Sequence, residues 1–328
     1  MKKILIIQTA FIGDVILATP LIEKLYDFFP EAKIDFLLRK GNESLFTDHP
    51  KLNEVIIWDK KKNKYLGLFQ TIEKIRKKEY DLVVNLQRFA ASGLMTALSK
   101  GTEKVGFDKN PFSFSYTDKI KHQIGTGLHE TVRNLRLIRN ITGQRYYRPQ
   151  LYPTAANFEK VKQYQKGKYV CIAPTSVWFT KQYPAEKWLE LIEQIDESIT
   201  IYLLGAPSDK TAAEAIQSAA KRGNITVLCG DLNFLDSAAL MKGAAMNYVN
   251  DSAPMHMASS VNAPTTAIYC STIPSFGFGP VSTDSVIVET KKELECRPCG
   301  LHGLKKCPLG HFDCAHSIET SEIRVPEV

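Results

Sequence analysis

Blocks of apolar residues alternate with amphipathic segments along the chain. The first block, Ile4–Ile7, is a short run of leucine and β-branched residues, which predicts a buried parallel strand. Thr9–Gly13 then form a turn, after which apolar residues recur at helical spacing. These helical positions are Val15, Ile16, Leu17, Leu21, Ile22 and Leu25.

The same pattern predicts the other elements. In the first half we expect strands at Ile34–Leu38, Val55–Trp58, Leu82–Leu86 and Val105–Phe107, and helices at Leu66–Lys78, Ala90–Leu98 and Glu130–Ile141. The alternation restarts after Gln144–Pro153, a linker with two prolines and three tyrosines. In the second half we expect strands at Tyr169–Ala173, Ile201–Leu204, Ile225–Leu228, Tyr248–Val249 and Thr265–Tyr269, and helices at Ala185–Ile195, Lys210–Arg222, Leu235–Gly243 and Met255–Val261.

This order of elements predicts an α/β fold. Strands separated by helices of this length are typical of βαβ units in a parallel sheet. A chain of 328 residues exceeds the size at which single cores usually stop growing. We therefore predict two consecutive doubly wound domains, residues 1–150 and 151–328, with the active site in the cleft between them.

A carboxylate, Asp14, lies where the first strand passes into a helix. Ligands bind at the carboxyl ends of strands in open α/β sheets, so Asp14 could take a proton from a substrate hydroxyl. It could equally cap the helix, because Asp is favoured at helix N-termini. Gly13 is the only glycine of this turn, so the G-x-G-x-x-G dinucleotide fingerprint is missing.

Two strand ends of the second half carry groups suited to a nucleotide. Thr175 and Ser176 follow one strand, and Lys181 comes shortly afterwards. A hydroxyl-rich turn with a lysine can bind phosphate oxygens. Asp209 follows the next strand, where a carboxylate can accept hydrogen bonds from a ribose diol. The alternatives are a solvated lysine for Lys181 and a helix cap for Asp209.

A third strand end carries the sequence Asn250-Asp251-Ser252-Ala253-Pro254-Met255-His256. Pro254 suits an early helical position, so the amides near Ser252 and Ala253 would face an anion. Asp251 could instead be a cap, and His256 a helix histidine with its bonds satisfied. All three strand ends would lie on one edge of a single sheet, and we therefore predict a phosphate-binding site there.

Charge and hydropathy limit the classes of function. The longest stretch without Asp, Glu, Lys or Arg, Ser252–Thr283, contains four prolines and does not suit a membrane span. We expect no signal peptide, and a soluble cytoplasmic protein. Residues 1–150 carry 26 Lys and Arg against 16 Asp and Glu, whereas residues 151–328 carry 16 against 19. The basic half predicts an anionic partner. Nucleic acid is disfavoured, because no helix-turn-helix or zinc-finger spacing is present.

Four of the seven cysteines lie close together near the end of the chain, at Cys296, Cys299, Cys307 and Cys314. Such a set could supply a structural Zn²⁺ site, with nearby histidines as alternative donors. The spacing differs from the paired CxxC motifs of common zinc modules. Free thiols that pack a small terminal subdomain are the default interpretation. Cys171, Cys229 and Cys270 are expected in the core.

Taken together, these motifs resemble glycosyltransferase family 9, the ADP-heptose:lipopolysaccharide heptosyltransferases. The resemblance covers almost the whole chain. It is carried by Gly13-Asp14 with Thr19-Pro20, Lys181 with Tyr183-Pro184, Gly205-Ala206-Pro207-Ser208-Asp209, Asp251-Ser252 with His256, and the tail CRPCGLHGLKKCPLGHFDC.

The resemblance implies a GT-B fold of two Rossmann-like domains, an N-terminal one for the acceptor and a C-terminal one for the nucleotide sugar. It implies inverting transfer of a heptose from ADP-heptose to the lipopolysaccharide inner core, without a metal or other cofactor. Asp14 would be the general base, Lys181 the phosphate-binding lysine and Asp209 the ribose-binding acid. Asp251, Ser252 and His256 would lie near the diphosphate and sugar. The protein would act in the cytoplasm or peripherally on the inner face of the inner membrane.

Two departures from the family pattern affect the donor pocket. Ala253 stands where the family usually has glycine, and Pro174-Thr175-Ser176 stands where it often has Pro-Gly-Ala. The alternatives are a transferase of the same fold with another nucleotide sugar or acceptor, and a sugar-nucleotide-binding protein without turnover. A pure binder has no need of a carboxylate at Asp14.

Overall fold

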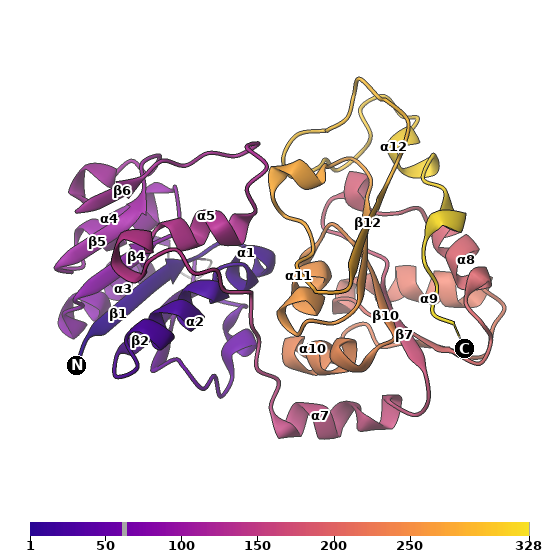
Figure 1. Cartoon of the computed structure of the whole chain (residues 1–328), viewed down its shortest axis with the longest axis horizontal. Coiled ribbons are helices and arrows are strands. Elements are labelled where there is room, and N and C mark those ends of the chain that lie inside the picture. Colours follow the sequence, from indigo (N-terminus) through magenta and orange to yellow (C-terminus); the bar gives the residue numbers. More distant parts are fainter. Residues whose placement is uncertain (61–63, 328) are drawn as a thin grey trace. The chain divides into compact units, whose positions relative to one another are not determined.

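The computed structural model describes residues 1–60 and 64–327. The chain divides into two compact units, Met1–Tyr152 and Pro153–Val328. The division falls inside the proline- and tyrosine-rich segment Gln144–Pro153. Figure 1 shows each unit as a sheet flanked by helices.

The first unit is built on a six-stranded parallel sheet. Its strands are β1 (Lys3–Gln8), β2 (Lys33–Arg39), β3 (Glu54–Trp58), β4 (Leu82–Asn85), β5 (Glu103–Phe107) and β6 (Asp118–Ile120). Its helices are α1 (Ile12–Ile16), α2 (Thr19–Phe28), α3 (Lys64–Lys78), α4 (Ala90–Ala97), α5 (Glu130–Arg136) and α6 (Arg139–Thr142). The strand order is β3-β2-β1-β4-β5-β6, so the topological switch point lies between β1 and β4.

The second unit repeats this topology. Its strands are β7 (Tyr169–Ala173), β8 (Thr200–Leu203), β9 (Ile225–Val227), β10 (Met246–Asn250), β11 (Thr265–Tyr269) and β12 (Ser285–Glu289). Its helices are α7 (Ala155–Val161), α8 (Ala185–Gln194), α9 (Lys210–Ala219), α10 (Phe234–Gly243), α11 (Ala253–Ser260) and α12 (Asp313–His316). The order β12-β11-β10-β7-β8-β9 puts the switch point between β10 and β7.

Burial explains why these segments are strands. Ile4–Ile7 are fully buried, because helices cover both faces of a parallel sheet. In the second unit, β7 and β8 supply Val170, Ile172, Ile201 and Leu203 to a core that also contains Trp188. The predicted parallel α/β architecture is confirmed.

Some predicted elements were wrong in detail. The helix expected at Glu130–Ile141 is interrupted, because the N–H of Leu137 bonds to Asn134 O in a tighter turn and α6 begins only at Arg139. The pattern missed β6, β12 and α7. These strands are short or half-exposed at the sheet edges, so their apolar periodicity is weak.

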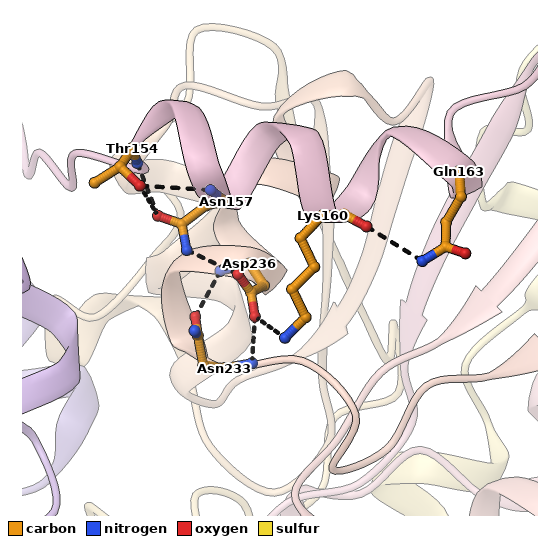
Figure 2. Close-up of polar contacts among 6 residues, drawn as sticks. All are labelled: Thr154, Asn157, Lys160, Gln163, Asn233 and Asp236. Atoms are coloured by element: carbon orange, nitrogen blue, oxygen red, sulfur yellow. Dashed lines mark hydrogen bonds and ion pairs between the residues drawn. The ribbon is translucent and has the colours of Figure 1, made fainter.

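α7 and α10 are joined by two linked capping boxes (Figure 2). Thr154 and Asn157 cap the start of α7, and Asn233 and Asp236 cap the start of α10. The two boxes meet where Asn157 Nδ2 donates to Asp236 Oδ1 at 2.7 Å. The buried Asp236 also accepts from the ammonium of Lys160 at 2.6 Å. This cluster fixes α7 at the beginning of the second unit.

Candidate functional site

Asp14 lies in the first turn of α1, directly after the carboxyl end of β1. The N-cap position of this helix belongs to Phe11, so Asp14 is not the cap. The end of α1 is tied to α5, because Asn134 Nδ2 on α5 donates to the O of Leu17, the C-cap residue of α1, at 3.1 Å. Asp14 is half-buried at the switch-point edge of the first sheet, where a ligand is expected.

A second carboxylate, Glu130, lies in the same region of the first unit. Its Oε2 accepts from Nε and from Nη2 of the buried Arg133, at 2.8 Å and 2.6 Å. Burial raises the pKa of Glu130; the charge of Asp14 adds to this rise, and the charges of Arg133 and Arg88 oppose it. Two carboxylates and two guanidinium groups are therefore grouped near the switch point. The sequence pattern did not single out Glu130, because only the topology brings α5 beside α1.

The loop after β7 in the second unit is tied to the end of β10. The side chain of Asn250 donates to Pro174 O at 2.9 Å and accepts from the N–H of Tyr183 at 2.8 Å. Thr175 and Ser176 are half-buried in this loop, and Gln182 Nε2 donates to Ser176 O at 2.6 Å. The loop that carries the hydroxyl groups therefore keeps a defined position at the switch point.

Lys181 ends the short 3₁₀ turn Phe179–Lys181 and is held by a carboxylate. Its Nζ lies 2.8 Å from Asp251 Oδ2, and both side chains are largely buried. The same oxygen accepts from Thr272 Oγ1 at 2.6 Å. Lys181 is thus neither a solvated lysine nor isolated. An ammonium has three donors, and the contact with Asp251 uses one of them.

Asp209 follows β8, which pairs with β7. It stands at the N-cap position of α9 but makes no side-chain cap there. Its Oδ2 instead accepts from the N–H of Ala206 at 2.7 Å. Gly205 permits this bend, since a Cβ at position 205 would lie 3.0 Å from that same oxygen. The carboxylate is half-buried at the edge of the sheet.

Ser252, rather than Asp251, is the N-cap residue of α11, and its side chain does not cap the helix. Ala253 and Pro254 begin the first turn, and Ser252 and Ala253 are only half-buried. His256 is buried in the same helix. The predicted residues therefore lie at the carboxyl ends of three adjacent strands, β10, β7 and β8.

Hydrogen bonds of two further residues, Thr180 and Arg297, hold together the segments at this edge of the second sheet. Thr180 Oγ1 accepts from Ser271 Oγ at 2.9 Å. The guanidinium of Arg297 donates to Cys270 O at 2.7 Å and to Thr272 O at 2.8 Å. These contacts join segments far apart in sequence, and a lone Thr or Arg carries no periodic pattern that would reveal them.

The four terminal cysteines lie near one another, with Cys314 buried and Cys296, Cys299 and Cys307 half-buried. Cys314 is buried in the core of the second unit and Cys307 packs against it, while Cys299 Sγ donates to Cys296 O at 3.3 Å. Burial raises the pKa of Cys314 to about 12, and the neighbouring Cys299, Cys296 and Cys307 add to the rise. No group of three or more His, Cys, Asp or Glu within residues 1–60 and 64–327 is arranged to hold a metal ion.

The three other cysteines, Cys171, Cys229 and Cys270, are buried as expected. As for membrane crossing, the helices of the described part of the chain are all too short or too polar to span a bilayer.

Comparison with known proteins gives a consistent result. Residues 68–305 match the model of "Glycosyltransferase family 9 (heptosyltransferase)". The lipopolysaccharide heptosyltransferase 3 of Escherichia coli K12 is 27% identical over 286 residues, which cover 79% of this chain and 80% of that protein. Among solved structures, the E. coli ADP-heptose lipopolysaccharide heptosyltransferase II has a TM-score of 0.77 at 21% identity and covers 91% of this chain and 96% of its own.

An E. coli heptosyltransferase crystallised with ADP-2-deoxy-2-fluoro heptose has a TM-score of 0.71 at 22% identity, covering 88% of this chain and 93% of that one. These structural similarities establish the GT-B fold. The family model covers well over half of the sequence. The chain belongs to glycosyltransferase family 9, the heptosyltransferase family.

Proposed function

We propose that this glycosyltransferase moves a heptose from ADP-heptose to the lipopolysaccharide inner core, with inversion at the anomeric carbon. The observation that carries the proposal is the grouping of Lys181, Asp251 and Asp209 at three adjacent strand ends of the second unit. The heptosyltransferase relatives support heptose as the sugar and lipopolysaccharide as the acceptor.

In this proposal the predicted domain 151–328, which corresponds to the second unit, binds the donor. Lys181 and the amides around Ser252 and Ala253 contact the diphosphate, with Thr175 and Ser176 beside it. Asp209 accepts from the ribose hydroxyls, and His256 lies near the sugar. Asp251 keeps the lysine ammonium at the sheet edge through its 2.8 Å contact. The similarity to a heptosyltransferase solved with an ADP-heptose analogue supports this assignment.

The predicted domain 1–150, which corresponds to the first unit, then binds the acceptor beside Gly13 and Asp14. An acceptor hydroxyl attacks the anomeric carbon as the bond from that carbon to the diphosphate breaks. Asp14 takes the hydroxyl proton, and ADP leaves with the bonding electrons. The positive charge of this half suits an acceptor that carries acidic sugars or phosphates.

We further propose that no metal is needed in this step. Lys181 and the helix amides can balance the charge that develops on the departing diphosphate. The sequence also has no Asp-x-Asp pair to bridge a metal to a diphosphate. Because the acceptor lies at a membrane surface, we assign the protein to the cytoplasm, peripherally on the inner face of the inner membrane.

The test is incubation of the protein with ADP-heptose and a panel of truncated lipopolysaccharides, with products identified by mass spectrometry. A product one heptose heavier than its acceptor, with an inverted anomeric configuration by NMR, supports the proposal. Transfer only from other nucleotide sugars would contradict the donor, and transfer only to other acceptors would contradict the acceptor. Binding of ADP-heptose without product on any acceptor would indicate a non-catalytic protein.

A further inference from the structure

The cysteine-rich loop, Cys296–Cys314, is anchored to the strand ends that form the proposed donor site. In Figure 1 this orange-to-yellow segment runs as loops from β12 to α12. Besides its bonds to Cys270 O and Thr272 O, Arg297 pairs with Glu289 at 2.6 Å. The N–H of Cys299 donates to Ser271 O at 2.9 Å. The start of the loop is therefore bonded to the segment that directly follows β11.

The same loop is also fixed to the residue that precedes Lys181. The N–H of Thr180 donates to Leu304 O at 3.1 Å, and the N–H of Leu304 donates to Thr180 Oγ1 at 2.8 Å. The N–H of Ser271 in turn donates to Thr180 O at 3.2 Å. Thr180 is almost completely buried. These reciprocal bonds leave the loop little freedom to move away from Lys181.

Gly303 lies against the methylene stem of Lys181. A Cβ at position 303 would lie only 2.8 Å from Lys181 Cγ and 3.1 Å from Thr180 Oγ1. Cγ is near the root of the lysine side chain, so the whole side chain would have to shift. At its other end the ammonium is paired with Asp251 at 2.8 Å. Lys181 is therefore held at its root by the loop and at its charged end by a carboxylate.

We propose that Gly303 is a positioning residue, whose missing side chain lets the cysteine-rich loop pack on Lys181 and direct its ammonium toward the diphosphate of the donor. This inference rests on the proposed role of Lys181. In this arrangement the cysteine-rich loop packs behind the phosphate-binding lysine.

The chain contains a matched control. Gly303 has φ +75° and Gly300, in the same loop, has φ +73°, but a Cβ at Gly300 would meet no atom within 4 Å. Alanine at either position introduces the same left-handed backbone strain. Only alanine at position 303 contacts the lysine.

The experiment measures ADP affinity by calorimetry for the full chain and for Gly303→Ala, Gly300→Ala, Lys181→Ala and the double variant Gly303→Ala/Lys181→Ala. Gly303→Ala is expected to weaken ADP binding at least about tenfold, because small displacements of a charge-positioning group are costly. Gly300→Ala is expected to bind ADP as the unchanged protein does. In the Lys181→Ala background, Gly303→Ala should weaken binding no further.

Equal ADP affinity of the Gly303 and Gly300 variants would overturn the inference, as would an equal loss from Gly303→Ala in both backgrounds. Thermal melting tests the contact independently of binding. The melting temperature should fall less on Gly303→Ala when residue 181 is alanine, because Cγ is then absent; an equal or larger fall contradicts the contact. Unchanged ADP affinity in Lys181→Ala alone would instead overturn the lysine's role in the proposed function.

Discussion

At the scale of single residues, the ion pair of Lys181 and Asp251 in the second unit explains how a lysine can stay charged in a largely buried position. Lys181 and Asp251 are both largely buried, and a buried charge without a partner is strongly unfavourable. The carboxylate therefore stabilises the lysine when no ligand is bound. A diphosphate would approach the remaining donors of the same ammonium. Two predictions test the role of Asp14 in the first unit and the role of Lys181 in the second unit independently.

Asp14→Asn is expected to lower the rate of transfer by roughly 10²–10⁴, the usual contribution of a general base, and to leave ADP affinity unchanged. The amide keeps the shape of the side chain but cannot accept the acceptor's proton. Steady-state kinetics with calorimetry check both parts. Glu31→Gln, which alters an exposed carboxylate after α2, is the control and should have no effect. A rate close to that of the unchanged protein would refute the assignment.

Lys181→Ala should weaken ADP binding and slow transfer together, because the ammonium faces the diphosphate in both the ground state and the transition state. It should also destabilise the protein by roughly 3 kcal/mol, since Asp251 is left buried and unpaired. Calorimetry and urea denaturation measure the two effects.

The double variant Lys181→Ala/Asp251→Asn distinguishes stability from binding. Removing the carboxylate charge should restore much of the lost stability, whereas ADP affinity should stay low. Recovery of ADP binding in the double variant would show that Lys181 does not contact the nucleotide.

At the scale of elements, the joined caps of α7 and α10 are the polar cluster that fixes the start of the second unit (Figure 2). Asp236 is fully buried. Burial by itself would raise the pKa of Asp236, but Lys160, Asn157 and the amide of Asn233 together lower it. The folded protein therefore prefers the ionised carboxylate more than the unfolded chain does.

Asp236→Ala is expected to lower the free energy of unfolding of the second unit by about 2–4 kcal/mol, because several charge-assisted bonds are lost at once. Lys160→Ala should cost less, since the amide bonds to Asp236 remain. The stabilising effect of Asp236 is complete above the unfolded pKa, about 4, and is lost as the pH falls through the lower folded value. Denaturation curves at neutral and acidic pH measure this, and equal losses in both variants would contradict the network.

At the scale of the whole molecule, two sheets with the same strand order carry different polar groups at their switch points. The first presents Asp14 and Glu130, and the second presents Lys181 paired with Asp251. In the proposed function each sheet edge binds a different ligand. The basic first half suits the anionic acceptor of that proposal.

Chelation is expected to leave transfer intact, because protein groups can stabilise the departing diphosphate. Activity measured with and without EDTA is the check, with excess Mg²⁺ added back as the control. Prompt loss of activity that Mg²⁺ restores would overturn the metal-independent mechanism. Slow loss with unfolding that Zn²⁺ restores would show that the cysteine-rich loop binds a structural ion.

The first unit should lose stability below neutral pH. Burial, together with the nearby Lys51, lowers the pKa of His49 to about 4, and its ring packs against Phe46 and Tyr152. The unfolded chain binds this proton near pH 6.5, so stability falls as pH drops from about 6.5 toward 4, by up to about 1.4 kcal/mol per pH unit. His49→Asn should reduce the dependence of the unfolding free energy on pH over this range, while His122, whose pKa burial also lowers to about 4, keeps its own contribution. An unchanged slope would exclude His49 as a cause.

The sequence by itself determined most of the fold. Fully buried parallel strands are continuous apolar runs, so the sequence predicts β7 and β11 with their observed bounds. Gly13, Asp14, Lys181, Asp209 and Asp251 were recognisable because each follows such a run. Strand ends at the carboxyl edge of a parallel sheet are the expected place for ligands.

Only the tertiary structure decided which of these groups meet. The pairing of Lys181 with Asp251, the approach of Glu130 toward Asp14, and the packing of Gly303 on the lysine all join segments distant in sequence. Periodicity reports which face of an element is buried, not which neighbour covers it. Strand order places β10 beside β7. The chain after β6 returns to bring α5 to the end of α1, and the cysteine-rich loop returns to the lysine. The sequence therefore determines which chemical groups are available, whereas the tertiary structure determines which of these groups contact one another.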